Sequence, residues 1–250
     1  MNRVGVLIVA ACALLLGMPV VRARDENLSL EMSTGLASRY VYRGIERSAE
    51  NWQTSFEGIV AGWRGRFWLE RPFSSNAPGE LQSMLGYSWP VANQWLVEVK
   101  GTHFWYVDAP VEGAAGHSFE GAVVLSLNTR SHWRPAVEFA YDIRYHSRAI
   151  EVSLARDITF KASGAVLEFR AYGGQVAAEY VLPDSKERST SDEYSYFGAG
   201  IYLRHRLGLH WEMTEEASLA GTANQAESWS PVGGRSGTRG WVAVGTSYRF

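Results

Sequence analysis

Glutamates recur along this chain where polar and apolar residues alternate, and they fall in the polar phase of the pattern. Side chains two residues apart lie on the same face of a β-strand, so these carboxylates would share one surface. Such a surface attracts cations and repels anions. The same polar phase also contains Glu31, Glu80, Arg204 and Arg249. The residues predicted to line a lumen and set its selectivity are Glu57, Glu70, Glu98, Lys100, Glu120, Glu138, Glu151, Glu168, Arg170 and Glu212.

Hydrolysis of lipids is a second chemistry to consider, because Tyr145-His146-Ser147 places a base beside a nucleophile, with Glu151 downstream. Adjacent residues of a strand point to opposite faces, so only a local bulge would bring His146 and Ser147 together. The Gly-x-Ser-x-Gly signature of serine hydrolases is absent. We therefore predict no catalytic residues and no enzyme. A lipid hydrolase of the lipid A deacylase or phospholipase type is the alternative.

Metal, cofactor and nucleic-acid chemistry find no support in the composition. The six histidines lack His-x-x-x-His spacing, and the single cysteine, Cys12, lies in an apolar N-terminal stretch. The formal net charge is −2, whereas nucleic-acid-binding domains are basic. We expect no metal site, no cofactor and no nucleic-acid partner.

Two-residue alternation, which is the signature of β-strands, recurs at short intervals, and helical periodicity is scarce. The pattern predicts about 12 strands, an even number as in single-chain bacterial barrels. Several are about 10 residues long, enough for a tilted strand to cross a bilayer. The predicted strands cover residues 28–42, 52–63, 66–72, 79–89, 95–106, 116–127, 133–143, 147–157, 165–177, 193–204, 208–220 and 241–250.

The alternation predicts an all-β fold, a closed antiparallel transmembrane β-barrel. Opposite the glutamates lie large apolar side chains, as expected for a wall that faces lipid. Aromatic residues gather near the strand ends, where they would form girdles at the bilayer interfaces. The predicted lipid-facing residues are Phe119, Val123, Leu125, Val137, Phe139, Tyr141, Ile150, Val152, Leu154, Leu167, Phe169 and Ala171.

Connections in such a barrel alternate between outer loops, mostly long, and short periplasmic turns. The predicted outer loops are residues 43–51, 73–78, 107–115, 144–146, 178–192 and 221–240. The predicted turns are residues 64–65, 90–94, 128–132, 158–164 and 205–207.

Both ends of the chain predict export to the outer membrane of a Gram-negative bacterium. Residues 1–23 combine an early positive charge, an apolar core and small residues, which predicts a cleavable secretory signal peptide. A retained transmembrane helix is the alternative. Residues 24–250 would then form a single barrel domain. Tyr248 and Phe250 resemble the C-terminal insertion signal of outer-membrane barrels, which implies contact of the last strand with the barrel assembly machinery.

Residues 33–45 read Ser-Thr-Gly-Leu-Ala-Ser-Arg-Tyr-Val-Tyr-Arg-Gly-Ile. This stretch resembles the mature N-terminus of the TorF-type porin family, in which aromatic residues and Arg-Gly-Ile follow a Ser/Thr-rich strand. The length, the predicted signal peptide and the terminal Phe fit that family as well. The resemblance implies an outer-membrane barrel with porin function, and it implies no catalytic residues.

The predicted function is that of an outer-membrane porin, through which small hydrophilic solutes diffuse passively, with a weak preference for cations because the lumen is acid-rich. Its partners would be outer-membrane lipids, lipopolysaccharide, and small hydrophilic solutes or ions. Glu–Arg and Glu–Lys pairs could instead plug a barrel of this intermediate diameter. A closed structural or adhesion barrel with partner-binding outer loops is therefore a further alternative.

Overall fold

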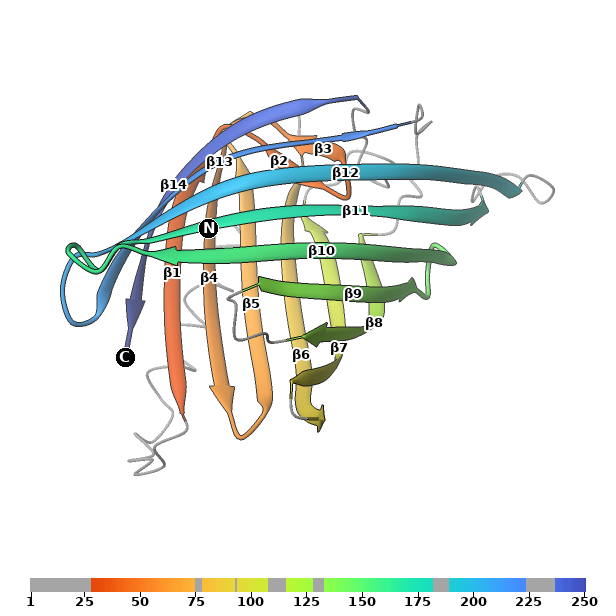
Figure 1. Ribbon diagram of the computed structural model, residues 1–250. Coiled ribbons are helices and arrows are strands. Elements are labelled where there is room, and N and C mark those ends of the chain that lie inside the picture. The colour runs from red at the N-terminus through yellow and green to blue at the C-terminus, as the bar shows by residue number, and fades with distance from the viewer. Residues whose placement is uncertain are drawn as a thin grey trace, which may run out of the picture.

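The computed structural model describes residues 28–74, 78–92, 94–107, 116–127, 133–181, 189–223 and 237–250. Within them, twelve strands form a closed antiparallel barrel, as the alternation predicts (Figure 1). The ring runs from β1 through β14 and β13 down to β4, which pairs back with β1. No helix in these ranges is long and apolar enough to cross a membrane. The barrel strands are β1 (Ser29–Ala37), β4 (Asn51–Val60), β5 (Trp63–Pro72), β6 (Gly79–Ala92), β7 (Trp95–Val107), β8 (His117–Leu127), β9 (Trp133–Asp142), β10 (Ser147–Thr159), β11 (Val166–Val181), β12 (Ser189–Arg206), β13 (Trp211–Thr222) and β14 (Arg239–Arg249).

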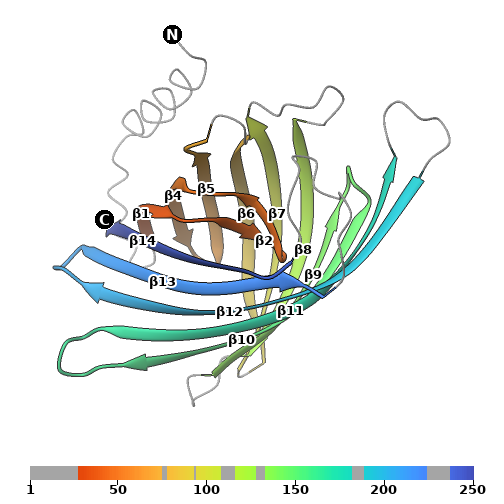
Figure 2. The same cartoon turned by 90° about the horizontal axis from the view of Figure 1, so that it is seen from above.

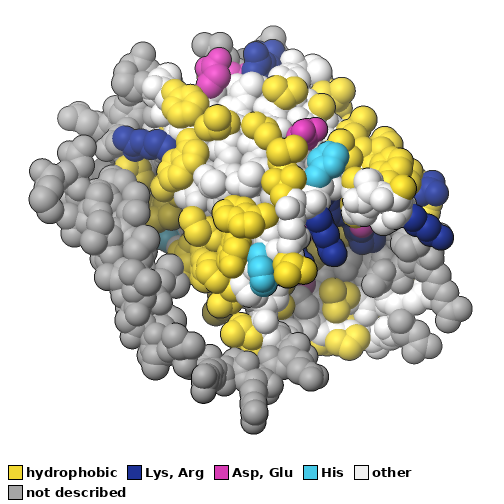
Figure 3. Space-filling view, turned by 90° about the vertical axis from the view of Figure 1, so that its left-hand side faces the viewer, with side chains coloured by type: hydrophobic (Ala, Val, Ile, Leu, Met, Phe, Trp, Pro, Cys, Tyr) yellow, Lys and Arg dark blue, Asp and Glu magenta, His cyan; other side chains and the backbone are white. Residues whose placement is uncertain are grey.

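Large apolar side chains cover the outside of the barrel (Figure 3). Phe67, Phe139 and Val152 are 59%, 56% and 57% exposed, whereas a protein that folds in water buries most such side chains. Because the strand period is two, the intervening polar residues face the lumen. The exposed set includes the predicted lipid-facing residues Phe119, Val123, Leu125, Phe139, Tyr141, Ile150, Val152, Leu154 and Phe169.

The two ends of the barrel differ, and we call the end that holds Phe250 the turn end and the other the loop end. At the turn end, β4 and β5 are joined by Ala61 and Gly62, whose φ angles of 48° and 87° are both positive. Paired positive φ angles are typical of the two-residue turns that match the twist of a hairpin. A Cβ atom on Gly62 would lie 2.7 Å from the Ser88 carbonyl oxygen. The turn predicted at 64–65 was therefore wrong by three residues.

The other predicted strands coincide with barrel strands to within a few residues, apart from the first strand and the ends of β11 and β12. The predicted loop 178–192 is wrong at both ends, because β11 continues to Val181 and β12 begins at Ser189. The central part of that loop and most of loop 221–240 lie outside the described residues, as does the predicted signal peptide.

The first predicted strand, 28–42, is wrong beyond Ala37, where the chain leaves the barrel wall. Residues 38–50 fold inward as a hairpin made of β2 (Tyr40–Tyr42) and β3 (Ile45–Ser48). Figure 2 shows these two strands inside the ring. Ala37 and Asn51 pair across β1 and β4, so the wall continues as if the hairpin were absent. The predicted outer loop 43–51 is thus mainly an interior element, which we call the lumen hairpin.

The barrel closes where the first strand meets the last. β1 and β14 pair from Glu31 opposite Arg249 to Ala37 opposite Ala243. Gly35 and Gly245 face each other in this seam, and a Cβ atom on Gly35 would lie 2.7 Å from the Val244 carbonyl oxygen. The small residues therefore let the two terminal strands approach closely enough to bond.

Replacing Gly35 with Val should weaken this closure, because the new side chain would collide with backbone that cannot move independently. We expect Gly35→Val to lower the urea midpoint and the yield of the compact, heat-modifiable band on a gel. Gly65→Val is the matched control, since no atom lies within 4 Å of a Cβ placed on Gly65. Equal stability of the two variants would contradict the role given to the seam.

Candidate functional site in the barrel lumen

The lumen hairpin turns at Arg43 and Gly44, which both have positive φ angles, 48° and 78°. A Cβ atom on Gly44 would lie 2.6 Å from the Gly221 carbonyl oxygen and 2.8 Å from the Tyr196 Cβ, so the tip lies directly against β12 and β13. The left-handed backbone of Arg43 costs about 1 kcal/mol. Its side-chain contacts must offset that cost.

Arg43 reaches the wall on the far side of the ring from β1. Its Nη1 and Nη2 atoms donate to the two carboxylate oxygens of Glu120 on β8, at 2.7 Å and 3.1 Å. Nη2 also lies 3.7 Å from Glu138 on β9, whose other oxygen accepts from Lys100 Nζ at 2.6 Å. The side chains of Arg43 and Glu120 are 7% and 8% exposed, so this bidentate pair is buried.

Arg47 anchors the hairpin to β6. Its Nη1 atom lies 2.7 Å from a carboxylate oxygen of Glu80, and the Tyr40 hydroxyl donates to the other oxygen at 3.2 Å. The Tyr42 ring lies between two guanidinium groups, 4.4 Å from Arg47 and 4.9 Å from Arg43. Cation–π contacts of this kind strengthen as water is excluded.

The flanks of the hairpin are attached to further strands. Ser48 donates to Glu70 on β5 at 2.5 Å. Arg239 on β14 donates to Glu46 at 3.0 Å, which ties the hairpin to the closing strand. The hairpin therefore binds the wall at several points around the ring. It packs across the lumen and is not a free loop.

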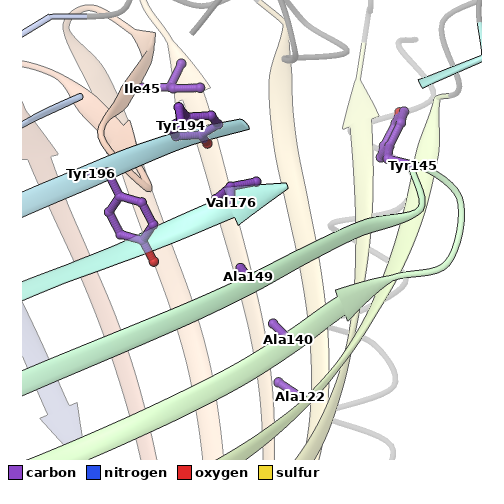
Figure 4. Close-up of a cluster of buried hydrophobic side chains, with 8 residues drawn as sticks. All are labelled: Ile45, Ala122, Ala140, Tyr145, Ala149, Val176, Tyr194 and Tyr196. Carbon is purple, nitrogen blue, oxygen red and sulfur yellow. The ribbon is translucent and has the colours of Figure 1, made fainter. Parts of the chain in front are cut away.

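Apolar packing completes the loop-end half of the lumen. Ile45 of the hairpin belongs to a buried cluster with Val176, Tyr194 and Tyr196 (Figure 4). The neighbouring wall carries small side chains at Ala122, Ala140 and Ala149. Larger residues there would occupy the volume that the hairpin and the tyrosines fill.

Empty space is unequal on the two sides of the hairpin. Between Tyr42, Arg47 and the wall residues Phe104, Glu120 and Asp142 the free volume is only about 10 Å³. Towards the turn end a cavity of about 470 Å³ lies against the hairpin, and a second of about 460 Å³ lies nearer the turn end. Five carboxylates and six arginines among the described residues line the two cavities. The hairpin thus brings positive charge into a lumen that the sequence predicts to be acidic.

The predicted lumen residues occupy three settings. The hairpin or its partners engage Glu70, Glu120, Glu138 and Lys100. Wall arginines pair with Glu57 (Arg64, 2.8 Å) and with Glu168 (Arg134, 3.1 Å; Arg204, 3.4 Å). Glu151 and Arg170 line the cavity below the hairpin, Glu212 lines the one nearer the turn end, and Glu98 Oε1 lies 3.0 Å from a Cβ placed on Gly86. The role of all these predicted lumen residues in ion selectivity stays a prediction.

The sequence analysis missed the arginines that matter most here, Arg39, Arg43, Arg47 and Arg66. Three of them lie in the stretch interpreted as strand end and loop. The available signal was the alternation of Tyr-Val-Tyr before Arg-Gly and of Ile-Glu-Arg-Ser after it, which is a hairpin pattern.

His146 and Ser147 do not meet. His146 is exposed, and its Nδ1 atom lies 3.1 Å from the Tyr141 hydroxyl, whereas Ser147 is 1% exposed and points inward. The Ser147 hydroxyl has no hydrogen-bond partner in the described part of the chain. No group of three histidine, cysteine, aspartate or glutamate residues in the described ranges could hold a metal ion.

Two solved structures share the architecture. A NanC porin structure aligns with a TM-score of 0.56 and 10% sequence identity, covering 88% of this chain and 98% of the other. LpxR from Salmonella typhimurium aligns with a TM-score of 0.51 and 7% identity, covering 88% and 99%. No family model and no curated protein matches the sequence. At these identities the likeness concerns the barrel fold alone.

The Arg43–Glu120 pair generates a test of how the hairpin is held. Removing Arg43 leaves the buried Glu120 carboxylate without its counter-charge, so Arg43→Met should lower the free energy of unfolding by about 3 kcal/mol. The double variant Arg43→Met/Glu120→Leu should recover part of that loss, because neither charge remains and Lys100 still pairs with Glu138. Urea unfolding in lipid or detergent measures both values. A double variant no more stable than the single one would refute this account.

Proposed function

We propose that this chain is an outer-membrane, porin-like barrel that passes small hydrophilic solutes by diffusion and that the lumen hairpin limits its conductance. The observation that carries the proposal is the combination of an apolar outer surface with a polar lumen that holds two cavities. The sequence pattern carries the proposal that residues 24–250 form one barrel domain after a cleavable signal peptide of residues 1–23.

The outer surface supports a position in the lipid bilayer of a Gram-negative outer membrane. Exposed aromatic rings gather at the turn end, where Trp63 and Tyr87 lie 4.9 Å apart and Tyr87 stacks on Trp89. Such rings mark the interface between lipid and water. Tyr248 and Phe250 lie 4.9 Å apart at the end of the chain, where we propose that the barrel assembly machinery reads the last strand. Lipids and lipopolysaccharide would surround the wall.

Ion preference depends on the balance between wall carboxylates and hairpin arginines. The wall carboxylates favour cations, and we retain a weak cation preference as part of the proposal. Arg43 and Arg47 oppose it, because each neutralises a wall carboxylate. Membership of the TorF-type family is likewise proposed, on the resemblance of residues 33–45, which include the turn of the hairpin.

A closed barrel with a structural or adhesive role is the second candidate, and one observation favours it. Among Tyr42, Arg47 and the wall residues Phe104, Glu120 and Asp142 the free volume is about 10 Å³, less than a chain of water molecules needs at that point. A lipid hydrolase finds less support, because His146 and Ser147 lie on opposite sides of the wall. The LpxR structure shares the barrel fold, but this likeness identifies no catalytic residue in the present chain.

Replacing residues 39–49 with Asn-Gly separates the first two candidates. Ala37 and Asn51 already pair, so a two-residue turn can join β1 to β4 without moving the wall. In planar bilayers we expect the variant to conduct several-fold more than the full chain. Its reversal potential should shift towards cations, because three arginines leave with one glutamate. The full chain, refolded in parallel, is the reference.

A folded variant that inserts but does not conduct would remove the porin proposal and leave the closed barrel. Conductance equal to that of the full chain would contradict the limiting role of the hairpin.

A further inference from the structure

Arg66 on β5 is a lumen arginine without an ion-pair partner among the described residues. Its cross-strand neighbour is Glu57, but the Glu57 carboxylate accepts from Arg64 Nη2 at 2.8 Å. Two guanidinium groups thus share one carboxylate on this part of the wall, and Arg66 is the one left over. The paired lumen arginines include Arg39, Arg43, Arg47, Arg64, Arg134, Arg204, Arg239 and Arg249.

Arg66 lies where the two cavities meet. It lines both of them, together with Gln53 and Trp68 from the same side of the ring and Tyr202 and Glu216 from β12 and β13. Glu216 makes no ion pair with Arg66; its Oε1 atom accepts from Trp241 Nε1 at 2.8 Å and from the Ser218 hydroxyl at 2.7 Å. The Arg66 guanidinium therefore lines the junction without an ion pair to any described carboxylate.

A second unpaired arginine lines the same space from across the ring. Arg170 on β11 lines the cavity beneath the hairpin and makes no ion pair within the described ranges. Its strand lies opposite β5 in the ring order. Both arginines face a cavity of about 470 Å³, which is large enough for a small organic solute.

An arginine in a partly desolvated lumen without a counter-charge is unfavourable for folding. The planar guanidinium matches a carboxylate with two parallel hydrogen bonds, which is how proteins commonly recognise carboxylates. The Gln53 amide and the Tyr202 phenol at the same junction can bond to hydroxyl groups. Trp68, whose ring centroid lies 5.1 Å from that of Tyr40, supplies a flat apolar boundary.

We propose that this junction binds small hydroxylated organic carboxylates, with Arg66 as the main anchor and Arg170 as a second positive charge. The site deepens the proposed porin function by naming a solute class, and it rests on solutes reaching the lumen.

Isothermal titration calorimetry of the refolded full chain in detergent tests the proposal with three matched solutes. D-gluconate carries a carboxylate, D-glucose is neutral and D-glucosamine is a cation, while all three are hydroxylated and similar in size. We expect gluconate to bind more tightly than the other two. Arg66→Gln should weaken gluconate binding by about tenfold or more.

Two further variants sharpen the result. Arg134→Gln removes a positive charge from the lumen away from the junction and should leave gluconate binding unchanged. Arg64→Gln should weaken it, because the freed Glu57 can then pair with Arg66. Urea unfolding separates binding from a structural role, since Arg66→Gln should keep or raise the midpoint.

Equal binding of the three solutes by the full chain would overturn the proposal. So would gluconate binding that survives Arg66→Gln, or a loss of binding accompanied by a large loss of stability. The calorimetry needs no conductance, so a barrel that fails to conduct can still bind gluconate. Failure of the porin proposal is therefore distinguishable from failure of this site.

Discussion

Pairing of every wall strand with two neighbours is the constraint on which the rest of this structure depends. Once β1 bonds to both β4 and β14, the sheet has no free edge and two surfaces. The period of two then sends each side chain either to the outside or to the lumen. Large apolar side chains dominate the outside, and the charged groups that form the ion pairs of the wall are directed inward. Charges confined to a lumen must find partners there or retain water, and this requirement explains the density of ion pairs around the hairpin.

The lumen hairpin meets that requirement with residues from one short stretch of chain. Arg43 and Arg47 supply the counter-charges of wall glutamates on β6 and β8, and Glu46 supplies that of Arg239 on β14. Separating the hairpin from the wall would leave these charges without their ion-pair partners. Buried pairs of this kind add little net stability compared with apolar packing, but they define one arrangement. The small alanine side chains in the cluster with Ile45 leave room for the hairpin in this one arrangement. A conducting lumen and a plugged one therefore differ in a single element that is anchored by a few ion pairs.

The sequence predicts the wall strands well because alternation is visible within a few consecutive residues. The apolar outer face and the polar lumen face together maintain this alternation along each strand. The prediction fails where one of these two faces is lost. Tyr40 and Tyr42 continue the alternation of β1, so the alternation alone does not show that the chain leaves the wall after Ala37; the only local signal is the hairpin pattern around Arg43 and Gly44. The partners of Arg43 and Arg47 lie on strands far along the chain, and pattern analysis does not see them. Strand β12 begins before its predicted start because residues 189–192 read Ser-Thr-Ser-Asp, which carries no apolar alternation. Strand β11 continues to Val181 by pairing with that segment. The turn at Ala61 and Gly62 was misplaced because alanine rarely adopts a positive φ. The unpaired state of Arg66 follows from the preference of Glu57 for Arg64, a choice of rotamers that no sequence pattern records.

The position of the hairpin between the first two wall strands also dictates an order of assembly. Its own turn is local and can form as soon as residues 40–48 are available. The contact of Arg43 with Glu120 spans 77 residues, and that of Arg239 with Glu46 spans 193 residues. Contacts so distant along the chain form late, because the chain must first lose the entropy of a long loop. The turn of the hairpin can therefore form early, whereas its ion pairs with the wall are completed only when β8 and then β14 are in place. Closure of the barrel and fixing of residues 38–50 in the lumen are thus coupled late events of folding.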